Sequence, residues 1–221
     1  MIIKQSDILI DHYLVGYHSF RKDHNFISFK GDLINDISEK FENLIFDQFD
    51  VGKLTILKSP SKSDIFEIKL ASNQLIFQED TSFENIVNNS KNILALWRKY
   101  SKFVDLRLAG IIYNFRINID PLKLKIPFEN LLMFFHKFPF GKELFSLGFN
   151  TRYSTIVNKH NYTIKVSLNQ NNINEPIQGT MDFHIINEKI EQGVTDKEID
   201  NVFSDSKFYF ENNFLNILNG K

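Results

Sequence analysis

Apolar and polar residues alternate along residues 1–100 with periods that predict a strand, a helix and three further strands. Residues 8–20 have the mixed pattern of a strand. Six apolar residues at helical spacing then predict a helix: Leu33, Ile34, Ile37, Phe41, Leu44 and Ile45. Residues 53–58 and 65–70 are β-rich runs around a Ser/Pro-rich turn at 59–63, and a third strand ends near Gln78.

A second helix follows, because Thr81 and Glu84 have the spacing of a capping box. Its buried stripe comprises Phe83, Ile86, Val87, Leu94 and Trp97.

The same order of elements is predicted after residue 100. A long strand covers 103–119, with a bend at Gly110, and a helix starts at Pro127. The strands that follow are 149–157, 162–168 and 177–186. A capping box at Thr195 and Glu198 then opens a final helix that runs to Gly220.

Both halves therefore read as strand, helix, three strands, helix. This order predicts an α+β fold with a largely antiparallel, twisted sheet, two β-α-β-β-β-α pseudo-repeats, and helices on one face. Only Ser101 and Lys102 separate the halves, so we expect a single domain over 1–221, with pseudo-repeat halves 1–100 and 101–221.

Composition narrows the classes of function. The chain has no Cys, which excludes disulfides, thiolate metal sites and a Cys nucleophile. A net charge of −1 is unlike that of a general nucleic-acid or membrane binder. The sequence shows neither a signal peptide nor an apolar run long enough to cross a membrane, so we expect a cytoplasmic protein without a membrane partner.

Glu67-Ile68-Lys69 is the best candidate for catalysis. A strand with Glu-x-Lys and an upstream acid, here Asp50, resembles the restriction-type nuclease motif, in which the carboxylates hold Mg²⁺ and the Lys assists the attacking water. The pattern is short, and an exposed ion pair between Glu67 and Lys69 explains it as well. We favour the ion pair, and with it no cofactor.

Two further groups are candidates for binding. Phe134 and Phe140 belong to an aromatic stretch over 128–149, which is either core or a surface for a partner. Arg107 and Tyr113 share strand parity with Asp105 and are expected on one face, with Arg116 on the other. An internal Asp105–Arg107 pair and a role in anchoring a ligand are equally favoured there.

The segment Asp105-Leu-Arg-Leu-Ala-Gly-Ile-Ile-Tyr-Asn-Phe-Arg-Ile117 resembles the central signature of a sporadically distributed family of uncharacterised bacterial proteins. That signature is roughly Arg-x-Gly-Leu-Arg-Tyr-x-Asn-x-Ile, and Arg107, Gly110 and Tyr113 match it with small shifts. The chain departs from it at Ile112 and Asn114. The resemblance implies a bacterial origin and a link to defence systems, but no activity.

The leading functional hypothesis is a non-catalytic binding or sensing module that acts with another protein or by self-association. The alternatives are a metal-dependent nuclease that uses Asp50, Glu67 and Lys69, and a nucleic-acid-binding saddle on the open face of the sheet.

Overall fold

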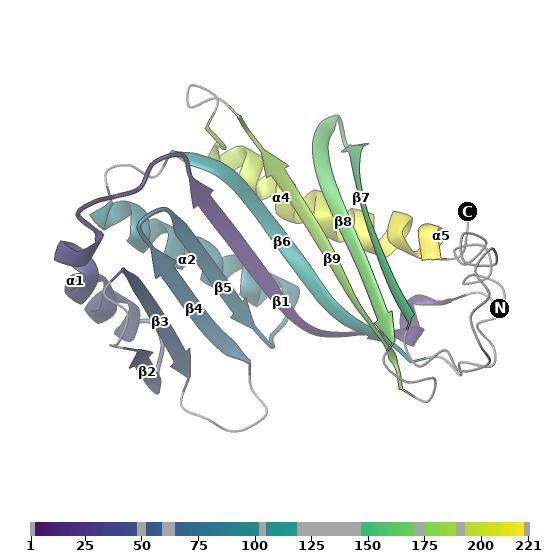
Figure 1. Cartoon of the computed structure of the whole chain (residues 1–221), viewed down its shortest axis with the longest axis horizontal. Coiled ribbons are helices and arrows are strands. Elements are labelled where there is room, and N and C mark those ends of the chain that lie inside the picture. The colour runs from purple at the N-terminus through teal and green to yellow at the C-terminus, as the bar shows by residue number, and fades with distance from the viewer. Residues whose placement is uncertain are drawn as a thin grey trace. The chain divides into compact units, whose positions relative to one another are not determined.

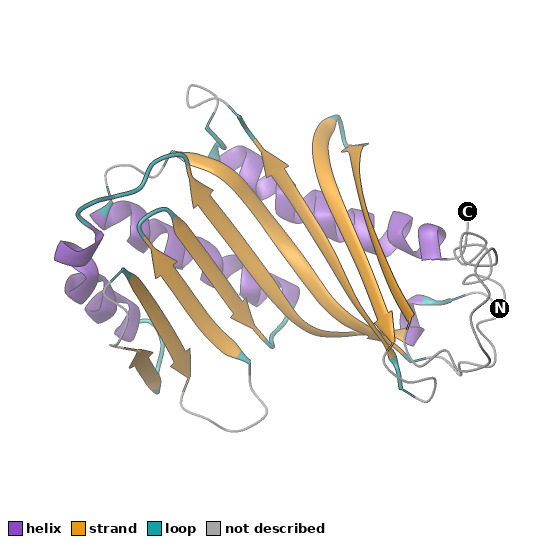
Figure 2. Ribbon diagram, viewed as in Figure 1, coloured by secondary structure: helices purple, strands orange, loops and turns teal. Residues whose placement is uncertain are grey.

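The computed structural model describes residues 3–47, 52–58, 65–101, 105–118, 147–170, 175–188 and 193–218. Within these ranges the chain forms a large antiparallel sheet of nine strands, accompanied by helices (Figures 1 and 2). The predicted α+β fold with a largely antiparallel sheet is confirmed. None of the described helices is long and apolar enough to cross a membrane.

The elements of the first half are η1 (Gln5–Asp7), β1 (Ile8–Ser19), α1 (Phe26–Ser38), β2 (Leu44–Asp47), β3 (Lys53–Lys58), β4 (Phe66–Ala71), β5 (Gln74–Glu79) and α2 (Phe83–Tyr100). Those of the second half are β6 (Leu106–Ile117), β7 (Leu147–Val157), β8 (His160–Gln170), β9 (Ile177–Ile186), α4 (Asp196–Tyr209), the π-helical turn η4 (Phe210–Phe214) and α5 (Leu215–Leu218). Hydrogen bonds order the strands β2-β3-β4-β5-β1-β6-β9-β8-β7.

Contacts group the chain into two compact units, each made of separate segments. Unit 1 comprises Met1–Asp11, Tyr113–Phe183 and Ser204–Lys221, and unit 2 comprises His12–Ile112 and His184–Phe203. The single domain over 1–221 stays a prediction.

The first helix is shorter than its apolar pattern predicted. It ends at Ser38, and Leu44 and Ile45 belong to strand β2 instead. Asn43 has a φ of 59°, a left-handed conformation that no α-helix continues through. Four strands therefore separate α1 from α2 where three were predicted, and the pseudo-repeat is not confirmed.

The two capping predictions had different outcomes. At α4, Glu198 N donates to Thr195 Oγ1 at 3.2 Å and Thr195 N donates to Glu198 Oε2 at 2.8 Å, which is the predicted capping box. At α2 the cap is Ser82, one residue later than predicted, since its Oγ accepts from Asn85 N at 3.2 Å.

In unit 2, α1 and α2 cover one face of the strands β1 and β3–β5 (Figure 2). The hydroxyls of Tyr17 on β1 and Ser90 on α2 hydrogen-bond at 3.2 Å, and Phe29 of α1 stacks on Tyr100 of α2. The strand residues on this face are fully buried: Val15, Tyr17, Leu54, Ile56, Ile68, Leu70, Leu75 and Phe77.

The core of unit 1 is aromatic. Phe210 stacks on Tyr113 with 4.6 Å between ring centroids, and Phe115 meets both Phe210 and Phe214 edge-on. Strands β7 and β8 form a hairpin through a two-residue turn at Asn158 and Lys159, both with positive φ. That conformation is typical of the type I′ turn, which matches the twist of the strands it joins.

Candidate functional site

Several of the predicted site residues lie outside the described residues. Asp50, Phe134 and Phe140 are among them, and so is most of the aromatic stretch over 128–149. Their predicted roles in metal binding and partner binding stay predictions.

Glu67 and Lys69 form the ion pair that the sequence favoured. Lys69 Nζ lies 2.7 Å from Glu67 Oε2, and Gln78 Nε2 donates to the same oxygen at 2.8 Å. The carboxylate is thus held by one side chain of its own strand, β4, and one of the neighbouring β5. Among the described residues, no three His, Asp or Glu side chains are grouped as a bound metal ion would require.

Arg107 and Tyr113 do not share the environment that strand parity predicted. The alternation of burial along β6 slips by one residue between Leu106 and Ala109, as at a β-bulge. Arg107 is therefore exposed, whereas Tyr113 is buried and its hydroxyl hydrogen-bonds to that of Ser206 at 2.9 Å. The contacts of Tyr113 are those of a core residue.

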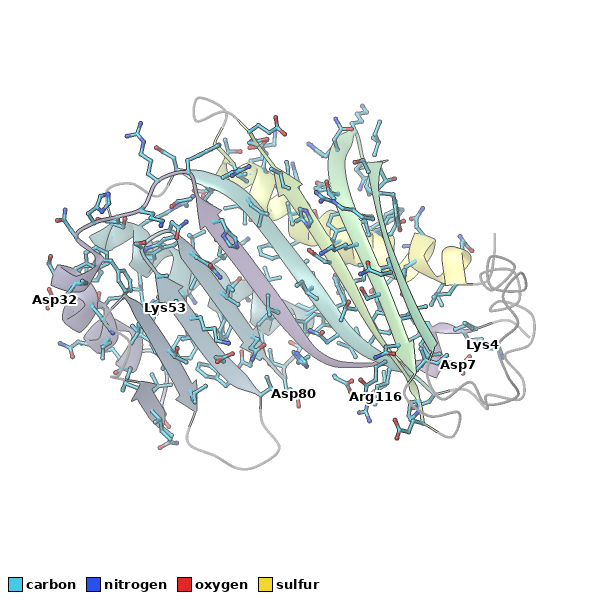
Figure 3. All side chains as sticks on the ribbon, viewed as in Figure 1. Lys4, Asp7, Asp32, Lys53, Asp80 and Arg116 are labelled. Carbon is cyan, nitrogen blue, oxygen red and sulfur yellow. The ribbon has the colours of Figure 1, made fainter. Side chains whose placement is uncertain are left out.

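Arg116 has the partner that a charge on this strand needs. Its Nε and Nη2 both lie 2.7 Å from Oδ1 of Asp11 in unit 1 (Figure 3 labels Arg116). The pair balances the charge of Arg116 within the described fold.

The face of unit 2 that the described helices α1 and α2 leave uncovered carries a regular grid of side chains, which we call the open face. The register of the antiparallel pairs defines three rows across the strands β3, β4, β5 and β1. The rows are Leu57–Glu67–Gln78–Leu14, Thr55–Lys69–Ile76–Gly16 and Lys53–Ala71–Gln74–His18 (Figure 3 labels Lys53). All alternate along their strands with the buried residues that face the helices.

Aliphatic side chains on the open face are accessible to solvent. Leu57 is 41% exposed, and its cross-strand partner Ile45 on β2 is 46% exposed. Leu14 and Ile76 are partly exposed on the central strands of the unit. The open face thus combines aliphatic groups with the cations Lys53 and Lys69.

A cleft of about 300 Å³ lies between α2 and the start of α4, also within unit 2. Its lining residues are Lys91, Leu94, Ala95, Arg98, Asp196, Ile199 and Asp200. Arg98 pairs with Asp196 at 2.5 Å, and Lys91 pairs with Asp200. The two ion pairs balance the four charges and join α2 to α4, which is the arrangement of a structural contact between helices.

Sequence reasoning missed the open face as a unit. The alternation within 53–58 and 66–71 indicates which residues share a face of each strand. It does not give the register between strands, which places Leu57 beside Glu67 and Gln78 beside Leu14.

No model of a known protein family matches the chain, and no curated protein matches it.

Proposed function

We propose that the chain is a non-catalytic, cytoplasmic binding module that holds a protein partner on the open face of unit 2. The carrying observation is the set of accessible aliphatic side chains, Leu57, Leu14 and Ile76, which lie in two of the three rows on a sheet face that α1 and α2 leave uncovered. Burying apolar area contributes roughly 25 cal/mol per Å², so such a face favours association.

The charges on the face indicate the character of the partner. Lys53 and Lys69 are the cations of its three rows, and Glu67, which pairs with Lys69, is an acid of the same rows. A partner with an apolar centre and acidic groups around it would complement this arrangement.

A protein fits the face better than a nucleic acid does. Proteins that hold single strands stack bases on aromatic rings. The aromatic side chains of these strands point the other way: Tyr17 and Phe77 are fully buried against the helices. Aliphatic groups in the middle of the face suit an apolar protein surface instead.

The resemblance of residues 105–117 supports a bacterial setting for the module, with a link to defence systems. The resemblance concerns the biological context of the protein. The choice of the open face as the binding surface rests on the geometry of unit 2.

The test is capture of the partner by matched surface variants of the tagged chain in lysate of its source. Leu57→Asp and Ile76→Asp should each lose a stoichiometric protein that the unmodified chain retains. Ile156→Asp, on β7 of unit 1, is the control because Ile156 is 70% exposed and belongs to a strand outside the open face as defined. Equal unfolding midpoints show that the variants are folded.

The outcomes separate the alternatives. Retention of the same partner by Leu57→Asp and Ile76→Asp would contradict the proposal, as would its loss in Ile156→Asp. Bound material that disappears on nuclease digestion would favour the nucleic-acid alternative. A change of oligomeric state in Leu57→Asp and Ile76→Asp, but not in Ile156→Asp, would identify the partner as a second copy of the chain.

A further inference from the structure

His18 and Arg107 lie side by side on neighbouring strands of unit 2. Phe20 N donates to Asp105 O at 3.0 Å, which pairs residue 20 of the chain leaving β1 with residue 105 before β6. Arg107 lies two residues further along β6, where the ladder is irregular, because Leu106 O and Arg107 O both accept hydrogen bonds from the other side, from Val194 N and Asn187 N. Adjacent strands of a sheet lie about 4.8 Å apart, so His18 and Arg107, each two residues from the Phe20–Asp105 hydrogen bond, are neighbours.

Both side chains belong to the open face. His18 stands between Tyr17 and Ser19, which are buried on the helix side, and Arg107 follows the buried Leu106. On the other side of His18 the register places Gln74 of β5. Three hydrogen-bond donors from three adjacent strands thus extend the row that begins at Lys53.

No acid neutralises this group within the described part of the chain. Arg107 makes no ion pair or side-chain hydrogen bond with any described residue, and the expected pair with Asp105 is not formed. Asp105 and Arg107 are the charged groups that β6 brings near His18, whereas β5 presents the uncharged Gln74 and Ile76. On the other side of Arg107, Asn187 N donates to Arg107 O at 2.9 Å, and the exposed Glu188 that follows forms no ion pair with Arg107 among the described residues.

The electrostatics of the pair are unfavourable without a further group. Burial and the Arg107 guanidinium lower the pKa of His18 below its ordinary value, so the imidazole is neutral at neutral pH. Like charges that lie close together on neighbouring strands repel each other, which disfavours the charged imidazole. An anion between the two residues would remove the repulsion and favour the imidazolium.

We infer that His18, Arg107 and Gln74 form a binding site for an oxyanion, the phosphate or carboxylate group of a ligand on the open face. The guanidinium provides a planar fork that matches either group, and the imidazole and the amide donate from the neighbouring strands. The inference deepens the proposed function and rests on it, because the site lies on the face assigned to the partner.

The experiment is an NMR titration of the histidine side chains in the full chain with inorganic phosphate, and separately with acetate. Saturating phosphate should raise the pKa of His18 by about one unit. The exposed His24 is the internal reference. Arg107→Gln should abolish the response, whereas Arg152→Gln, which removes an exposed cation of β7 in unit 1, should preserve it.

Every outcome of the titration either supports or overturns the inferred oxyanion site. A saturable shift that needs Arg107 supports the site, and a stronger response to phosphate or to acetate identifies the group it prefers. A shift that does not saturate, or that persists in Arg107→Gln, overturns the inference. The probes are free ions, so the titration succeeds or fails independently of partner capture and of the Leu57→Asp result.

Discussion

Gly179 on β9 and Phe115 on the neighbouring strand β6 contact each other so closely that a Cβ atom at residue 179 would lie 2.3 Å from the phenylalanine ring. The same atom would lie 2.9 Å from Leu168 Cδ2. Phe115 is buried among Phe210 and Phe214, so the ring has little room to withdraw. The glycine thus creates the space in which the core of unit 1 is packed.

Gly179→Ala is therefore expected to destabilise the chain. Overpacking of a filled core typically costs about 1–3 kcal/mol, because neighbouring side chains must leave their preferred rotamers. The measurement is the free energy of unfolding in urea. Gly16→Ala is the matched control, since a Cβ atom there meets no other atom within 4 Å. Equal stability of the two variants would show that Phe115 can move.

Asp23 is a buried carboxylate of unit 2 that accepts one buried and one partly buried hydrogen bond. Ser101 Oγ donates to its carboxylate at 2.5 Å, and Asn25 N donates at 2.9 Å near the start of α1. Asp23→Ala leaves both donors without this acceptor, and an unsatisfied buried group costs about 1–3 kcal/mol. Urea unfolding should show this loss.

Asp32→Ala supplies the comparison for that loss, because Asp32 is exposed on α1 (Figure 3). It should leave stability unchanged within about 0.5 kcal/mol. A loss in Asp32→Ala as large as that in Asp23→Ala would mean that the buried hydrogen bonds are not the cause.

The elements that the sequence predicted best are those whose signals are local. Residues 53–58 and 177–186 form β3 and β9 with the predicted bounds, because a period of two and flanking turn residues define them. The end of α1 was missed because Phe41, Leu44 and Ile45 continue the helical spacing, while the backbone turns at Asn43.

The candidate sites depend on which strands are paired and in which register. The spacing of residues along the sequence does not contain that information. His18 and Arg107 are far apart in the sequence, and only the pairing of β1 with β6 places them together. Parity counted along 105–113 also predicted one face for Arg107 and Tyr113, and the slip in burial between Leu106 and Ala109 separates their environments. A slip of this kind reverses every assignment beyond it.

Acid is expected to remove the stabilisation that Asp36 contributes. Hydrogen bonds from Lys99 and then Tyr100 lower the pKa of the Asp36 carboxyl below its ordinary 3.8. A depressed folded-state pKa gives stability that is present above the unfolded-state pKa and is lost as pH falls through the folded-state pKa. The difference in urea midpoint between wild type and Asp36→Asn should therefore shrink from neutral to strongly acidic pH.

The partner of Asp36 gives the opposite prediction at high pH. Hydrogen bonding to Asp36 raises the pKa of Lys99 to about 12 from 10.5. The stability that Lys99 contributes is therefore fully present below its unfolded-state pKa and is lost as pH rises through the higher folded-state pKa. Asp32→Asn is the control on the same helix. A difference between wild type and Asp36→Asn that stays constant with pH would rule out this ion pair as the source.

The Glu67–Lys69 pair gives the sharpest test of the catalytic alternative. Glu67 already accepts hydrogen bonds from Lys69 and Gln78, so we expect no Mg²⁺- or Mn²⁺-dependent cleavage of DNA or RNA by the purified chain. Lys69 is the more exposed member of the pair, so Lys69→Ala should lower the free energy of unfolding by only about 0–1 kcal/mol. The nuclease hypothesis would be favoured over the binding module if cleavage needs the metal, is lost in Glu67→Ala and survives in Gln78→Ala. All three proteins must be folded for this comparison. Metal ligation would then have to compete with the hydrogen bond from Gln78, so that Gln78→Ala would cleave faster than wild type.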